Sequence, residues 1–96
     1  MNDEQICRRY FVSGRVQGVF YRVSAQQRGI DLQMRGWVRN RRDGRVEVFA
    51  CGSVHQHTAL KNWLEIGPPY AKVSNIDVID EAFVALPASF EIRSTA

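Results

Sequence analysis

The stretch Gly14-Arg15-Val16-Gln17-Gly18-Val19-Phe20-Tyr21-Arg22 joins an apolar run to a segment with helical spacing. Because glycine has no Cβ atom, Gly14 and Gly18 allow the N–H groups between them to turn inward. The following helix would add unpaired N–H groups and the positive end of its dipole, and Arg22 a planar, permanently charged side chain. This combination predicts an anion site that suits a phosphate group. A tight connection followed by a solvated arginine fits the same spacing, since glycine loops are common.

The composition predicts one globular domain over residues 1–96. The chain has 45% hydrophobic and 24% charged residues, and its length provides enough apolar material for a single core. No stretch is long and apolar enough to span a bilayer, so we expect no membrane partner. The acidic start, residues 1–5, lacks the basic region and apolar core of a secretory signal. We therefore expect a cytoplasmic protein, and nothing in the sequence demands more than a monomer.

Neither the cysteines nor the histidines have the spacing of a metal site. Cys7 and Cys51 lie in apolar runs and are too few for a disulfide framework, so we expect buried, reduced thiols. His55 and His57 are two residues apart on a predicted helix and hence on different faces. We expect both histidines at the surface and neither a metal ion nor a cofactor.

The first half of the chain predicts a strand, a helix and two more strands. Residues 6–13 are rich in aromatic and β-branched types, with Tyr10 and Val12 on one face. The helix spans Arg22 to Leu32, and a glycine on its apolar stripe suggests a close approach to a neighbouring element. Strands at 35–41 and 45–51 are joined by a turn at Asp43-Gly44. In the second of these, alternate residues share a face: Val46, Val48 and Ala50 on one, Glu47, Phe49 and Cys51 on the other.

The second half predicts a helix between two strong boundary signals. Ser53 and Gln56 form a capping-box pattern, and Gly67-Pro68-Pro69 ends the helix. Its buried stripe would be Leu60, Trp63 and Leu64. Beyond it we expect a strand at 72–79, a connection at 80–88, a short last strand at 90–93 and a frayed tail at 94–96.

This order of elements is the ferredoxin-like, split βαβ pattern of an α+β sandwich. Two helices should cover one face of an antiparallel sheet, with a short extra strand at the C-terminal end. The basic residues are nearly all arginine. Five of them surround the Asp43-Gly44 turn and would attract an anion or simply form a solvated hairpin: Arg35, Arg39, Arg41, Arg42 and Arg45.

Two motifs resemble the acylphosphatase family. The first is the stretch of residues 14–22, and the second, a glycine, an aromatic residue, a valine, a basic residue and an asparagine, is Gly36-Trp37-Val38-Arg39-Asn40. The resemblance extends over nearly the whole chain and includes the Gly67-Pro68-Pro69 break. The sequence departs from the family pattern at Gln33, where the family often has a glycine that ends the first helix.

The resemblance implies hydrolysis of a small-molecule acyl phosphate to a carboxylate and inorganic phosphate, without metal or cofactor. By position, Arg22 matches the family's phosphate-binding arginine and Asn40 its water-orienting asparagine. The phosphate oxygens would be held by the amides and side chains of Arg15, Val16, Gln17, Gly18, Val19, Phe20, Tyr21 and Arg22. The tail continues past the last strand, so we do not transfer the contact between this arginine and the terminal carboxylate of the family's animal members.

Positioning and charge stabilisation suffice for such a reaction, because the leaving carboxylate is weakly basic and phosphoryl transfer has a loose transition state. This explains why the motifs contain no nucleophile with a nearby base and no carboxylate cluster. We predict that Asn40 holds a water in line with phosphorus.

An RNA-binding module is the main alternative, since the same topology can stack bases on aromatic residues of the sheet. Phe11, Trp37 and Phe49, edged by Arg9 and Arg39, could form such a surface. Cross-strand aromatic packing explains the same residues, and the Arg35–Val38 fragment is on the wrong strand for an RNA-binding motif. We therefore expect no nucleic-acid partner. A domain of a larger maturation machine is a third possibility.

Overall fold

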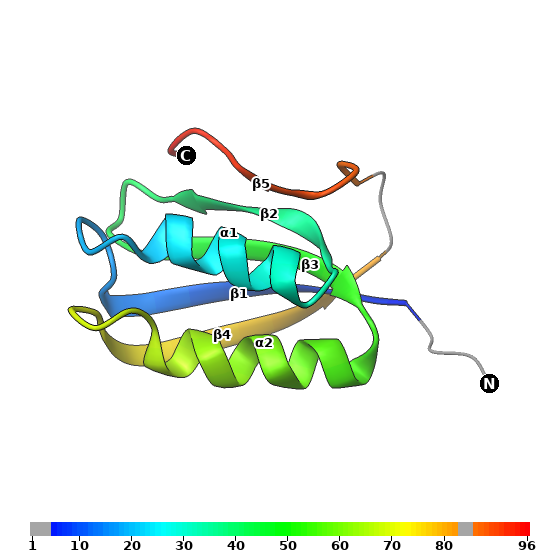
Figure 1. The fold of residues 1–96 in the computed structure, drawn as a ribbon. Coiled ribbons are helices and arrows are strands. Elements are labelled where there is room, and N and C mark those ends of the chain that lie inside the picture. Colours follow the sequence, from blue (N-terminus) through cyan, green and yellow to red (C-terminus); the bar gives the residue numbers. More distant parts are fainter. Residues whose placement is uncertain (1–4, 83–85) are drawn as a thin grey trace.

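A five-stranded sheet has both helices on one of its faces (Figure 1). The computed structural model describes residues 5–82 and 86–96. Its elements are β1 (Ile6–Arg15), α1 (Tyr21–Asp31), β2 (Arg35–Asn40), β3 (Val46–Gly52), α2 (Val54–Ile66), β4 (Lys72–Glu81) and β5 (Phe90–Ile92). The strand order is β4-β1-β3-β2-β5, in which β5 is parallel to β2 and the other neighbours are antiparallel. The predicted ferredoxin-like α+β fold and its extra C-terminal strand are confirmed.

Strand β3 lies in the middle of the sheet, and all seven of its residues are buried. Val46, Val48 and Ala50 belong to the core beneath the helices, whereas Phe49 and Cys51 belong to a smaller cluster on the other face. The predicted alternation is therefore confirmed. Because β1 and β2 both run antiparallel to β3, they run in the same direction, and their C-terminal ends lie at the same end of the sheet.

The register of these three strands decides which way Asn40 faces. Val46 of β3 is opposite Val12 of β1 on one side and Asn40 of β2 on the other. Residues in such a row point to the same face, and Val12 and Val46 face the helices. Asn40 thus lies on the helix-bearing face, at the end of the sheet where β1 also ends.

The helices begin and end largely where the sequence indicates. The backbone N–H of Gln56 donates to Ser53 Oγ, and the backbone N–H of Ser53 donates to Gln56 Oε1. These two hydrogen bonds confirm the capping box. A Cβ atom on Gly29 of α1 would lie 2.4 Å from the Phe90 ring, so the predicted close approach is real. Gln33 has φ 58°, the left-handed conformation that a glycine would adopt more easily.

Several boundaries differ from the sequence predictions. Strand β4 continues to Glu81, so Asp80 and Glu81 are strand residues and not part of a connection. Residues 83–85 of that predicted connection lie outside the described residues. The tail is not frayed: Arg93 N–H donates to Val38 O, and Ala96 N–H to Asn40 O, so it continues along the edge of β2.

The face of the sheet without helices is covered by arginine side chains. Trp37 and Phe49 stack with centroids 5.8 Å apart and are only 7% and 2% exposed. The guanidinium groups of Arg9, Arg39 and Arg93 lie over the Trp37 ring, and those of Arg41 and Arg45 over Phe11. The rings of Trp37 and Phe49 pack against each other and against arginines, so little of either ring is left exposed to a base.

Glu47 is the centre of this arginine layer. It is 1% exposed and forms ion pairs with Arg9, Arg39 and Arg41. Burial alone would raise the pKa of Glu47, but hydrogen bonds from these three arginines outweigh it and lower the pKa. Asp43 likewise accepts hydrogen bonds from Arg45 and Arg41, which lower its pKa. Much of the positive charge around the Asp43-Gly44 turn is therefore neutralised by neighbouring carboxylates.

Cys7 and Cys51 form a disulfide, so the expectation of reduced thiols was wrong, although both residues are buried. The cause is the register: Cys7 of β1 is directly opposite Cys51 of β3, with Cα atoms 4.1 Å apart. A separation of 44 residues in the sequence hides this juxtaposition.

The expectation of a surface position for His57 was also wrong, because its side chain is fully buried in the core side of α2. Its Nε2 atom lies 2.6 Å from Ile6 O, which can only accept, so Nε2 bears the proton. Nδ1 then accepts a hydrogen bond from Tyr10 OH at 2.7 Å. Burial lowers the pKa of His57, mainly because it penalises the charged imidazolium.

This burial predicts a loss of stability on mild acidification. Below the ordinary histidine pKa of about 6.5, the unfolded chain binds a proton that the folded His57 does not, so the free energy of unfolding falls as the pH drops. Urea unfolding between pH 7.5 and 5 should show a slope of up to about 1.4 kcal/mol per pH unit. The slope should flatten in His57→Gln and persist in the matched control His55→Gln, whose side chain is exposed. Equal slopes in all three proteins would contradict this assignment.

The ion pairs of Glu47 predict a second stability effect. Glu47→Gln removes the charge that holds three partly buried arginines together, so we expect a loss of about 2 kcal/mol in the free energy of unfolding by urea. Glu81→Gln removes a carboxylate that is 26% exposed and should cost clearly less. Equal stability of Glu47→Gln and the parent protein would show that the pairs contribute nothing.

Candidate active site

The loop between β1 and α1 is built on left-handed backbone conformations. Gly14 has φ 121°, and a Cβ atom there would lie 2.1 Å from Lys72 O, so the close pairing with β4 requires glycine. Gly18 has φ 74°, and nothing lies within 4 Å of the place where its Cβ would be. Phe20, the residue before α1, also has a left-handed conformation with φ 65°, which costs a bulky residue on the order of 1 kcal/mol. The chain thus turns sharply twice before the helix begins.

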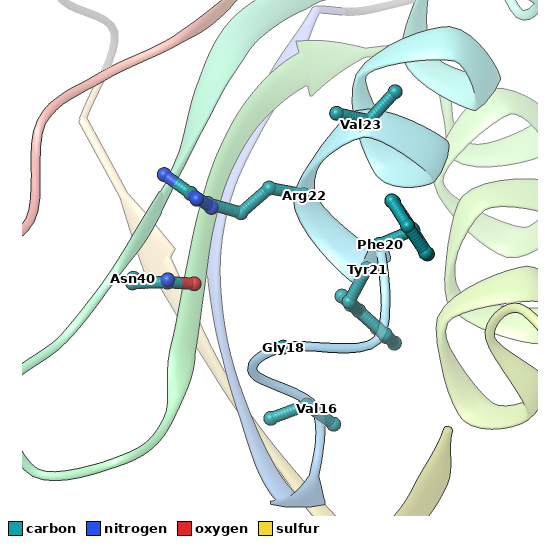
Figure 2. Close-up of a pocket in the computed structure, with 7 residues that line it drawn as sticks. All are labelled: Val16, Gly18, Phe20, Tyr21, Arg22, Val23 and Asn40. Carbon is teal, nitrogen blue, oxygen red and sulfur yellow. The ribbon is translucent and has the colours of Figure 1, made fainter. Parts of the chain in front are cut away.

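A pocket of about 250 Å³ lies between this loop, the start of α1 and the end of β2 (Figure 2). Its lining residues are Val16, Gly18, Phe20, Tyr21, Arg22, Val23 and Asn40. The first turn of α1 contains no acidic residue, and the side chain of Phe20 does not cap it. The unpaired N–H groups at the helix start therefore provide positive potential that no acidic side chain of that turn offsets.

Arg22 extends from α1 toward Asn40 across this pocket (Figure 2). Among residues 5–82 and 86–96, no carboxylate forms an ion pair with Arg22. This contrasts with Arg39 and Arg41, which are engaged by Glu47. The guanidinium of Arg22 is consequently available to an anion in the pocket.

Asn40 has an unsatisfied oxygen. Within the part of the chain that the structure describes, its Oδ1 atom is buried and has no hydrogen-bond partner. Figure 2 shows the oxygen end of the side chain turned toward the loop. A buried acceptor without a partner is costly, and such a group is usually satisfied by a water or a ligand. The backbone of Asn40 is fixed independently, since its carbonyl accepts from Ala96 N–H at 3.0 Å.

Gln17 connects the loop to the β2–β3 turn. Its Nε2 group donates to Arg41 O at 2.7 Å and to Arg45 O at 2.9 Å. Arg41 follows Asn40 directly, so these bonds link the loop to the strand end that presents Asn40. Residue spacing gave no sign of this contact, because it depends on how the turn folds over the loop.

The residues predicted to bind phosphate do not all line the pocket. Val16, Gly18, Phe20, Tyr21 and Arg22 do, whereas Arg15, Gln17 and Val19 do not. Asn40, predicted to orient the water, also lines it. Arg15 is an exposed residue at the end of β1, paired with Lys72. The Tyr21 side chain is buried and donates its hydroxyl to Leu64 O at 2.6 Å, and burial raises the pKa of that hydroxyl. Val23 was not predicted, although it follows Phe20 by three residues and so shares its side of the helix start.

The described residues contain neither a cluster of metal ligands nor a membrane-spanning helix. No three His, Cys, Asp or Glu side chains among them are grouped to bind a metal ion. None of the helices in residues 5–82 and 86–96 is long and apolar enough to cross a membrane.

Comparisons with known proteins show the family of the chain. The family model for acylphosphatase matches residues 8–92. A curated acylphosphatase of Cupriavidus pinatubonensis is 57% identical over 65 residues, which cover 68% of this chain and 72% of that protein. The solved structures of acylphosphatases from Coxiella burnetii and Bacillus subtilis superpose with TM-scores of 0.87 each. The former is 39% identical and covers 93% of both chains, and the latter is 34% identical and covers 92% of this chain and 98% of its own. The chain therefore belongs to the acylphosphatase family, hydrolases that act on acyl phosphates.

Proposed function

We propose that residues 14–22 bind the phosphoryl group of an acyl phosphate and that Asn40 orients the water that attacks it. The observation that supports this most directly is the buried Oδ1 of Asn40, which has no hydrogen-bond partner among the described residues and lines the same pocket as Arg22. An acceptor and a permanent cation that line one small pocket suit a water and an anion that must meet there.

The phosphoryl oxygens accept hydrogen bonds from the loop amides and from the N–H groups at the start of α1, and Arg22 compensates their charge. Asn40 Oδ1 accepts a hydrogen bond from the water, which leaves an oxygen lone pair directed at phosphorus. As the new P–O bond forms, the P–O bond to the acyl group breaks. The carboxylate departs with that electron pair, and the water proton passes to a phosphoryl oxygen. A loose transition state of this kind requires little from the protein beyond positioning and charge.

We also propose a monomer that works in the cytoplasm without a nucleic-acid partner. Each residue that lines the pocket comes from the same chain, so the proposed site needs no second copy. The arginine-covered rings of Trp37 and Phe49 offer no surface for base stacking, which supports the absence of a nucleic-acid partner.

The proposed roles predict different defects in two variants. Turnover of benzoyl phosphate, followed as carboxylate and phosphate release in excess EDTA, should fall about 10²–10³-fold in Asn40→Ala. Asn40→Ala should still be inhibited by inorganic phosphate, because the phosphate contacts remain. Arg22→Ala should lose both turnover and inhibition by phosphate. Normal activity in a folded Asn40→Ala protein would disprove the role of Asn40, and circular dichroism provides the folding control.

The contacts of Gln17 predict a positioning role in the same assay. Gln17→Ala removes both bonds that link the loop to the β2–β3 turn, so the phosphate and the water should be held less precisely relative to each other. We expect kcat for benzoyl phosphate to fall about tenfold, with a smaller change in inhibition by phosphate. Gln27→Ala is the matched control, because Gln27 is an exposed residue of α1 that does not line this pocket. A parent-like kcat in Gln17→Ala would contradict the proposal.

A further inference from the structure

One side of the pocket is formed by apolar groups that the phosphoryl contacts do not use. Phe20 and Val23 both line the pocket, yet their side chains are 78% and 57% exposed. Apolar side chains exposed at the mouth of a site for a charged group are available to an apolar part of a ligand.

The backbone at Phe20 is unusual for an aromatic residue. Its left-handed conformation, with φ 65° and ψ 23°, is one that glycine or asparagine adopts with less strain. Because the ring is largely exposed, core packing does not compensate for this strain. Strained residues of this type are concentrated at functional sites.

The proposed reaction geometry indicates which part of the substrate meets these residues. Attack in line places the water and the leaving group on opposite sides of phosphorus. In Figure 2, Asn40 lies near the guanidinium end of Arg22, whereas Phe20 and Val23 lie near the end of Arg22 that joins α1. A water held by Asn40 therefore directs the acyl group of the substrate toward Phe20 and Val23.

We propose that Phe20 and Val23 form an acyl-group subsite that selects aromatic or bulky apolar acyl phosphates over short ones. This inference rests on the proposed function for the direction of attack. The phosphoryl contacts are common to every acyl phosphate, so discrimination among substrates falls to these two side chains. Burial of a phenyl ring against them, in place of a methyl group, removes more apolar surface from water.

The test uses phosphonate analogues whose C–P bond is not hydrolysed. Isothermal titration calorimetry compares benzoylphosphonate, acetylphosphonate and inorganic phosphate on the full chain. We expect the parent protein to bind benzoylphosphonate about tenfold more tightly than acetylphosphonate. Phe20→Asn, which tolerates the left-handed backbone, should reduce this ratio to about 2. Val23→Thr should reduce it about twofold to threefold, whereas Val54→Thr, an exposed valine at the start of α2, should leave it unchanged.

The outcomes separate this inference from the proposed function. A parent ratio near 1, or a parent-like ratio in both Phe20→Asn and Val23→Thr, would overturn the subsite. Phosphate binding by each variant shows that its loop is folded, and if Phe20→Asn fails that control, Val23→Thr alone decides. Turnover of benzoyl phosphate and acetyl phosphate is measured separately. Absence of turnover by the parent, together with the expected binding ratios, would refute the hydrolytic function and leave the subsite supported.

Discussion

The pairing of β3 with both β1 and β2 is the constraint on which the rest of the structure depends. It makes β1 and β2 run in the same direction, so the loop that follows β1 and the last residue of β2 share one edge of the sheet. It also aligns Asn40 with Val12 and Val46, and thereby turns its side chain toward the helices. Because β3 is buried along its whole length, a slip in its register by one residue would move its polar Glu47 into the core. The same hydrophobic pattern that stabilises the core therefore fixes the direction of the asparagine.

Charge is distributed unevenly over the two faces of this sheet. On the face without helices, arginines are held by Glu47, Asp43 and Glu81, and they pack over aromatic rings. On the helix-bearing face, Arg22 meets the pocket without a described carboxylate as partner. The number of arginines in a segment thus says little about anion binding, since the position of nearby carboxylates decides which of them remains available.

The features that could be predicted from the sequence depend on residues close together in the chain. The alternation in β3, the capping box at Ser53 and the glycine-rich loop are of this type, and so are the two motifs that contain Arg22 and Asn40. The burial of His57 could have been found, because it precedes Leu60 and Leu64 at helical spacing. The disulfide and the contacts of Gln17 could not, since each depends on strand register or on a turn folding over a distant loop. The tail was missed because its pairing with β2 uses backbone groups, which are the same in every residue.

The disulfide between Cys7 and Cys51 closes a covalent ring around the functional part of the molecule. The ring contains the loop, α1, β2 and the exposed turn at Arg42-Asp43-Gly44, so Arg22 and Asn40 are both inside it. For a ring of this size, chain-entropy models assign about 4 kcal/mol of stabilisation, because the unfolded chain loses freedom. The ring also has a topological effect: one cut by a protease in the exposed turn leaves two segments, one with Arg22 and Asn40 and the other with β3, α2, β4 and β5, that the disulfide still joins. In its oxidised form the protein can be nicked there and still remain a single molecule.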